Sequence, residues 1–230
     1  MLLRVGQGRQ FRVVMRAMTL RRMIAFRIGS QLTTLFCAFA LALTAVMAVP
    51  VSARADDGSS PVGTITERMR GFQAAQVALA EFGVPYSWGG GSLLGPTLGF
   101  CDGTNGYLNG RCMADHTVGF DCSGLVRYAW FEASGGTVVL PHYSAAQAQL
   151  GRAVPNRSDL LPGDLLFFAD PGGPIHHVGL YLGNGAMIHA EHTGTNVAVL
   201  RDVFDDPTWG PRLVATVRPE PAASQPPGVA

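Results

Sequence analysis

The sequence contains no lysine, and no acidic residue precedes Asp56. All 17 basic residues are arginines, and eight of them lie in residues 1–55, so the rest of the chain carries nine arginines against 16 acids, a net charge of −7. This balance favours solubility and provides no basic patch for nucleic acid or anionic lipid. We therefore expect no nucleic-acid partner. The formal net charge of the whole chain is +1 because the eight arginines of residues 1–55 offset the negative charge of the rest.

The chain also lacks an internal repeat and any second module that could tether it to a surface. The part that follows residue 55 is long enough for one well-buried domain and too short for two. We read residues 56–63 as a linker and the Pro/Ala-rich residues 219–230 as a disordered tail with little to bury. The sequence thus predicts one domain at residues 64–218, and we expect a monomer.

Residues 1–55 have the composition of a secretory signal peptide. Residues 1–30 hold seven arginines, residues 35–49 are almost wholly apolar, and the small residues Ala53 and Ala55 precede the first acids. We expect cleavage after Ala55 and secretion to the cell envelope, with no stable membrane insertion afterwards. A permanent membrane anchor is the alternative, and a run of 15 residues is short for one.

Cysteine is scarce, and only Cys101, Cys112 and Cys122 follow the predicted cleavage site. An odd number in an oxidising compartment leaves one thiol unpaired. Cys101 and Cys112 bracket a segment rich in Gly and Asn, which is typical of a tight loop that a disulfide can close. That pairing leaves Cys122 free; a pair between Cys112 and Cys122, or an inert buried Cys122, are the alternatives. Without a C-x-x-C pair zinc is disfavoured, and we expect no metal or cofactor.

The spacing of apolar residues predicts helices first and strands second. It indicates a helix over 64–83, with Thr64 as N-cap and Gly83 near its end, a second over 121–136, and a short third one capped by Ser144. Short apolar or alternating runs then predict five strands, in residues 163–170, 177–183, 186–190, 196–203 and 212–219. This segregation indicates an α+β fold in which N-terminal helices pack on an antiparallel sheet of about five strands.

Cys122 follows Asp121, which is a good N-cap for the second predicted helix. In a first helical turn, exposed backbone N–H groups and the positive end of the helix dipole favour thiolate over thiol. A nucleophilic thiolate also needs a histidine base that is close in space. The segment "IHHVGLYLGNGAMIHA" offers three candidates, His176, His177 and His189.

The alternation of side chains along a strand separates these histidines. His177 shares a face with Gly179, whereas His176 lies on the opposite face. A glycine inside a strand often marks the close approach of another backbone, so a Cys122 helix that crosses Gly179 would place His177 beside the thiolate. After the "GNG" turn, His189 would lie near His177 and fix its tautomer. A core histidine satisfied by backbone groups is the alternative for His189.

Four segments, "YSWGGG", "FDCSGLV", "PGDLLFF" and "HVGLYLGNGAMIHA", occur in the order and spacing of the NlpC-type cell-wall cysteine peptidases, which the chain resembles over most of residues 66–218. The resemblance implies a papain-like fold. It also implies an enzyme that cuts amide bonds in peptidoglycan stem peptides, after D-glutamate and before the diamino acid. A transpeptidase or acyltransferase that uses the same thiol, and a non-catalytic domain that binds wall peptides, are the alternatives.

The resemblance further implies roles for individual residues. Cys122 is then the nucleophile, His177 the general base and His189 the polar group that orients the base. The residues implied in substrate binding are Tyr86, Asp121, Ser123 and Ser144. The segment "LPHYS" departs from the family pattern, because His142 stands where the family carries arginine. The long insertion after Gly91 predicts a stapled loop over the rim of the cleft.

Overall fold

The computed structural model of the protein describes residues 61–221, and the side chains of residues 65–221. The predicted signal peptide at 1–55, residues 56–60 of the predicted linker and residues 222–230 of the predicted tail lie outside the described residues. No helix in the described part of the chain is long and apolar enough to cross a membrane.

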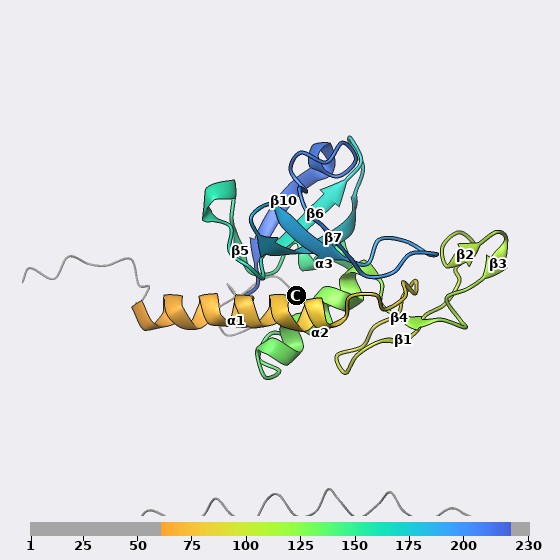
Figure 1. The fold of residues 1–230 in the computed structure, drawn as a ribbon, viewed down its shortest axis with the longest axis horizontal. Helices are drawn as coiled ribbons and strands as arrows, with labels where there is room; N and C mark the ends of the chain where they lie inside the picture. The colour runs from red at the N-terminus through yellow and green to blue at the C-terminus, as the bar shows by residue number, and fades with distance from the viewer. Residues whose placement is uncertain (1–60, 222–230) are drawn as a thin grey trace, which may run out of the picture. The chain divides into compact units, whose positions relative to one another are not determined.

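Two helices, α1 (Pro61–Ala80) and α2 (Cys122–Ala133), lie next to each other on one side of the sheet (Figure 1). The prediction of a first helix is confirmed, but it begins at Pro61, so Thr64 lies inside the helix and is not its N-cap. Proline fits the first turn of a helix because the N–H that it lacks would have no partner there. Gly83, with φ of 85°, lies in the turn after the helix, in a conformation that glycine adopts readily.

Six antiparallel strands form the sheet, one more than the five runs predicted. Each predicted run overlaps one strand, although the strand in the run 177–183 begins at Ile175 and not at His177. The additional strand has two residues, too few to show alternation in the sequence. In spatial order the strands are β5 (Arg152–Ala153), β10 (Leu213–Arg218), β6 (Leu165–Ala169), β7 (Ile175–Gly183), β8 (Ala186–His189) and β9 (Ala198–Leu200). Strand β7 is therefore central, with a neighbour on each side (Figure 1).

The two faces of the sheet are buried by different sets of side chains. The set on the helix side includes Val178, Leu180, Ala74, Ala78, Leu125, Val126 and Ala129. The set on the opposite side includes Phe168, Tyr181, Met187, Val203 and Trp209. Burial of a large apolar side chain stabilises a fold by about 1.5–3 kcal/mol. Because β7 is buried on both faces, its backbone position is well defined, and so is the position of His177, which it carries.

Two short ribbons lie between α1 and α2 in the sequence. Strand β1 (Thr97–Leu98) pairs with β4 (Val118–Gly119), and β2 (Tyr107–Leu108) pairs with β3 (Arg111–Cys112). The β2–β3 ribbon projects from the end of the domain farthest from the start of α1 (Figure 1). These ribbons belong to the predicted loop insertion.

Helix α3 (Ser144–Gln147) is shorter than the sequence indicates, and its N-cap is Tyr143. The prediction that Ser144 caps this helix is therefore wrong, because Ser144 is the first helical residue and is buried. Single 3₁₀ turns at Arg157–Asp159 and Gly210–Arg212 complete the connections.

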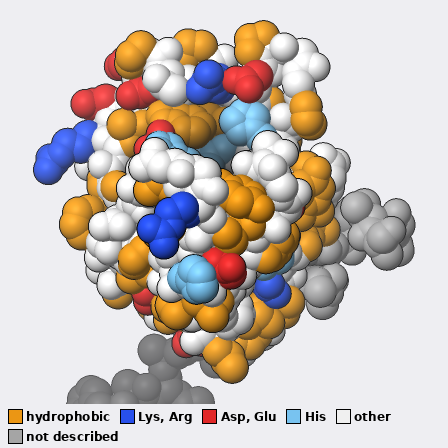
Figure 2. All heavy atoms as spheres, turned by 90° about the vertical axis from the view of Figure 1, so that its right-hand side faces the viewer, with side chains coloured by type: hydrophobic (Ala, Val, Ile, Leu, Met, Phe, Trp, Pro, Cys, Tyr) orange, Lys and Arg blue, Asp and Glu red, His pale blue; other side chains and the backbone are white. Residues whose placement is uncertain are grey.

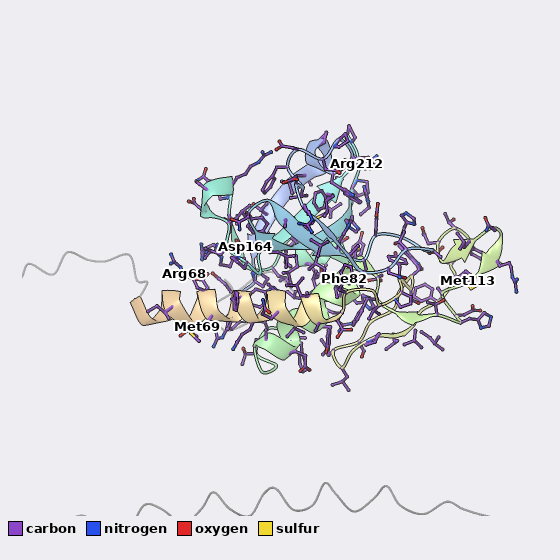
Figure 3. The ribbon with its side chains drawn as sticks, in the orientation of Figure 1. Arg68, Met69, Phe82, Met113, Asp164 and Arg212 are labelled. Carbon is purple, nitrogen blue, oxygen red and sulfur yellow. A yellow bond between two sulfur atoms is a disulfide. The ribbon has the colours of Figure 1, made fainter. Side chains whose placement is uncertain are left out.

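A buried ion pair joins the start of β6 to the end of β10. Arg218 Nε and Nη2 donate to the two carboxylate oxygens of Asp164 at 2.7 and 2.8 Å. The Asp164 side chain is 1% exposed and that of Arg218 is 10% exposed. Figure 3 shows Asp164 between the sheet and α1. The bidentate geometry makes this pair a strong tie between the two strands.

Candidate active site

Cys122 is the first residue of α2, and the structure confirms Asp121 as the N-cap. The Gly124 N–H donates to Asp121 Oδ1 at 2.6 Å, which satisfies one of the unpaired donors at the helix start. Gly124 also allows a close approach, since a Cβ there would lie 2.2 Å from the carbonyl oxygen of Gly90. The helix start is thus seated directly on the "YSWGGG" segment, and the cysteine side chain is only 8% exposed.

The Cys122 thiol is protonated in the free protein. Burial, together with the negative charge of Asp121, raises the pKa of the thiol to about 12. Backbone N–H groups of Val178, Ser123 and Cys122 act in the opposite direction and are outweighed. The helix start does favour thiolate, as expected, but burial and the charge of Asp121 outweigh this effect in the unliganded site. Burial removes the water that would solvate the anion, and the capping residue itself is negatively charged.

His177 and His189 form a buried pair. Their Nε2 and Nδ1 atoms lie 2.9 Å apart, and the two residues are 3% and 4% exposed. Strand β7 pairs with β8 so that Leu180 opposes Ile188, and this register brings His189 diagonally across from His177 on the same face of the sheet. His176 lies on the exposed side of the strand and pairs with Asp170 at 3.7 Å.

Both paired histidines are neutral near pH 7. Burial lowers the pKa of His177 well below 6.5, with smaller effects from His189 and His176. Burial also lowers the pKa of His189 to about 4. If His177 Nε2 carries the proton and donates it to His189 Nδ1, the second nitrogen of His177, Nδ1, is an available base.

Gly179 does not have the role that the sequence indicated. A Cβ at this position would lie 2.6 Å from the Met187 sulfur, on the face of the sheet that α2 does not cover. Helix α2 packs instead on the face that carries Val178. The expected crossing of the Cys122 helix over Gly179 is therefore wrong, although Cys122 and His177 line the same cavity.

Trp209 covers the histidine pair, and the sequence analysis missed it. Its ring centroid lies 4.4 Å from that of His177 and 5.5 Å from that of His189. The backbone N–H of Trp209 donates to Asp206 Oδ1 at 2.8 Å, which fixes the turn that presents the indole. The one signal in the sequence is a tryptophan in the turn segment "DDPTWG", outside any predicted strand. The indole limits the access of water to both imidazoles.

Asp121 is almost fully engaged by protein donors. Oδ1 accepts from Gly124 N–H, from Ser123 Oγ at 2.9 Å and from His142 Nε2 at 3.0 Å. Oδ2 accepts from Gly89 N–H at 3.1 Å. Each carboxylate oxygen has two lone pairs, so Oδ2, which accepts from one donor, has one lone pair left. His142, the departure from the family pattern, is thus a direct partner of the capping carboxylate.

Two cavities meet at Cys122. The larger, of about 680 Å³, is lined by Tyr86, Cys122, His177 and Trp209, whereas the smaller, of about 380 Å³, is lined by Asp121, Ser123, His142 and Ser144. Cys122, Trp88 and His176 line both. Figure 2 shows histidine side chains around a hollow in this face of the molecule. The structure therefore brings together all seven residues to which the sequence assigned catalytic or substrate-binding roles.

Tyr86 contributes a hydroxyl group to the larger cavity. Burial, together with the charges of Cys122 and Asp121, raises its pKa above the ordinary value of 10.0. The hydroxyl therefore stays protonated at all physiological pH values. It can donate a hydrogen bond to a negatively charged oxygen close to the thiol.

Cys101 and Cys112 form a disulfide, with their Cα atoms 5.9 Å apart. In the described residues, the one cluster of His, Cys, Asp or Glu close enough to hold a metal consists of these two cysteines and Asp115. Both sulfurs are bonded to each other, so they are not available as thiolate ligands. Cys122 is the free cysteine of the described chain.

A cysteine at the start of a buried helix, beside an antiparallel sheet that carries a histidine pair, defines the class of the protein: the fold is papain-like. The model of the NlpC/P60 family matches residues 83–218, and the chain belongs to this family. The family and the α+β, papain-like fold that the sequence predicts are thereby confirmed.

Curated relatives share about two fifths of their aligned residues with this chain. Peptidoglycan endopeptidase RipB of Mycobacterium tuberculosis is 42% identical over 145 residues, 63% of this chain and 53% of RipB. Gamma-D-glutamyl-L-lysine dipeptidyl-peptidase of Bacillus subtilis is 40% identical over 120 residues, 51% of this chain and 31% of that protein. The chain thus spans about half the length of RipB.

Solved structures of peptidoglycan hydrolase and P60 domains are also similar to this chain. The peptidoglycan hydrolase RipB from Mycobacterium tuberculosis superposes with a TM-score of 0.51 at 37% identity, covering 70% of this chain and 72% of that one. The P60 domain of an antigen from M. avium subspecies paratuberculosis has a TM-score of 0.51 at 36% identity, covering 67% of this chain and 98% of that one.

Proposed function

We propose that the protein is a cysteine endopeptidase that hydrolyses amide bonds in peptidoglycan stem peptides through an acyl-enzyme on Cys122. The observation that carries the proposal is the His177–His189 pair, whose His177 lines the same cavity as the Cys122 thiol. Relatives at about 40% identity are peptidoglycan endopeptidases by name, which supports this substrate class.

The chemistry begins from a neutral thiol and a neutral imidazole. His177 Nδ1 takes the thiol proton as the sulfur attacks the peptide carbonyl carbon. The backbone N–H of Cys122 and the Tyr86 hydroxyl donate to the oxygen that becomes negative. His177 then gives its proton to the leaving amine as the C–N bond breaks. Water, deprotonated by His177, releases the acyl group and restores the thiol.

The lining of the two cavities supports a placement of the two halves of the substrate. The leaving amine must take its proton from His177, which lines the larger cavity and not the smaller one. The acyl half therefore occupies the smaller cavity, where the open lone pair of Asp121 Oδ2 can accept from a substrate amine. Ser123 and Ser144 line the same space. The name of the Bacillus relative supports a D-glutamyl to diamino acid bond as the site of cleavage.

The composition of residues 1–55 supports two further parts of the proposal, export by a cleaved signal peptide and action in the cell envelope. We also infer that the domain acts as a monomer, because both halves of the site lie in a single chain.

The test is digestion of muropeptides of defined composition, with the products identified by mass spectrometry. Cys122→Ala and His177→Ala should abolish fragment release. His116→Ala is the matched control, because its imidazole is exposed and lines neither cavity, and it should retain most activity. Full cleavage by a folded Cys122→Ala variant would overturn the proposal. Products that carry an added amine in place of water would show transfer instead of hydrolysis.

A further inference from the structure

The disulfide closes a hairpin, here called the stapled hairpin and defined as residues 101–112, that contains β2 and β3. Four consecutive residues of it line the larger cavity: Thr104, Asn105, Gly106 and Tyr107. The stapled hairpin therefore forms one wall of the space that contains the thiol and His177.

This wall has a defined conformation. Asp102 accepts from the backbone N–H groups of Thr104 and Asn105 at 3.0 and 2.7 Å and from Asn105 Nδ2 at 3.0 Å. The Met113 N–H donates to the Gly106 carbonyl at 2.9 Å, directly behind the lining residues. Together with the disulfide, these bonds hold the lining backbone in one position.

A second wall is the loop of residues 191–195, which begins two residues after His189. Glu191, His192 and Thr193 of this loop line the same cavity. The two walls touch where Leu108 meets Gly194, since a Cβ on Gly194 would lie 3.2 Å from Leu108 Cδ1. Leu108 and Gly194 directly follow the lining residues Tyr107 and Thr193 in the chain, so this contact joins the two walls next to their lining residues.

We propose that the stapled hairpin is a specificity element that restricts the leaving half of the substrate to uncross-linked stem peptides. The inference rests on the proposed function, which places the leaving amine in the larger cavity. A space of about 680 Å³ has the size of a typical pocket for one compact ligand. A cross-linked stem carries a second peptide on the side chain of its diamino acid, and we infer that this branch would meet the wall where Leu108 packs on Gly194.

The test compares kcat/KM for a disaccharide tetrapeptide and for its cross-linked dimer. Leu108→Ala removes the contact between the walls, and the double variant Cys101→Ser with Cys112→Ser releases the base of the hairpin. We expect the ratio of monomer to dimer cleavage to fall by about fivefold or more in each, on the scale of a pocket that loses a few methylenes. The ratio of the two kcat/KM values does not change when part of a variant is unfolded, because both values fall by the same factor.

Leu98→Ala is the matched control, because Leu98 is an exposed leucine of the same insertion that lines neither cavity. Its ratio should equal that of the unaltered protein. An unchanged ratio in both hairpin variants, or equal cleavage of monomer and dimer by the unaltered protein, would overturn this inference alone. Failure of the unaltered protein to cut either substrate would instead overturn the proposed function.

Discussion

His177 Nε2 and His189 Nδ1 lie 2.9 Å apart, so one imidazole orients the other. Many nucleophile–histidine sites use a carboxylate or an amide in this position. A neutral imidazole fixes the tautomer without adding negative charge, which is consistent with the lowered pKa of His177.

This relationship predicts the behaviour of two substitutions. His189→Asn retains an acceptor close to the position of Nδ1, whereas His189→Ala leaves His177 Nε2 without a partner. We expect kcat to fall by about 10²-fold in the alanine variant and far less in the asparagine variant, with KM little changed in both. Steady-state kinetics on a muropeptide would measure this. Equal losses in the two variants would contradict an orienting role.

The acid limb of the pH–activity profile should lie at an unusually low pH for a histidine base. His177 must be neutral to take the thiol proton, and burial lowers its pKa well below 6.5, so the neutral form persists into acid solution. We expect kcat/KM to stay level from pH 8 to below pH 6.5 before it falls. A midpoint at or above 6.5, the ordinary histidine value, would show that the imidazole is not desolvated in the working protein.

Trp209→Ala should move that acid limb upward. The indole packs on His177 at 4.4 Å between ring centroids, and its removal admits water that stabilises the imidazolium. We expect the midpoint to shift toward 6.5 and kcat to fall about tenfold. Trp209→Phe keeps an aromatic ring over His177, so its midpoint and its kcat should lie between those of the unaltered protein and of Trp209→Ala. A loss of kcat without any shift of the midpoint would show that Trp209 acts only by packing.

Alkylation of Cys122 by iodoacetamide should report a protonated thiol. With a pKa raised to about 12, the thiolate fraction grows with every unit of pH through the neutral range. We therefore expect the alkylation rate to rise about tenfold per pH unit from pH 6 to 9, and peptide mass spectrometry would measure it. Glutathione is the control, because its alkylation rate levels off near the pKa of its own thiol. A plateau at neutral pH would reveal a preformed thiolate–imidazolium pair.

Asp164→Asn tests the buried ion pair with Arg218. Loss of the Asp164 charge leaves the mostly buried Arg218 with Glu67, at 3.8 Å, as its remaining ion-pair partner, so we expect the free energy of unfolding to fall by about 3 kcal/mol in urea titration. The control is Asp170→Asn, which breaks a pair with Arg212 at a 61% exposed carboxylate and should cost less than about 1 kcal/mol. An equal loss of unfolding free energy in the two variants would contradict the inference that burial makes the Asp164–Arg218 pair the more important one.

The features that local periodicity determines could be predicted from the sequence. Asp121 and Cys122 mark a helix start through capping, which needs only four consecutive residues. The "GNG" turn fixes a hairpin, and its parity places His177 and His189 on one face of the sheet. These are properties of neighbours along the chain.

What could not be predicted depends on contacts between distant segments. The net pKa of Cys122 depends on how deeply the site is buried, and this burial outweighs the local preference of the helix start for thiolate. Trp209 reaches the histidines from a turn far along the chain, and no local pattern identifies its partner. Gly179 has its neighbour in Met187, across the strand pair, and a strand pattern does not say which backbone approaches a glycine.

Burial of Cys122 has a consequence for the durability of the protein. Oxidants and disulfides react with thiolates, and oxidation to the sulfenic acid follows thiolate character and exposure. A thiol with a pKa of about 12 and only 8% exposure is a poor target for peroxide and for thiol–disulfide exchange. We therefore expect the free protein to remain reduced at Cys122 while it carries the disulfide between Cys101 and Cys112.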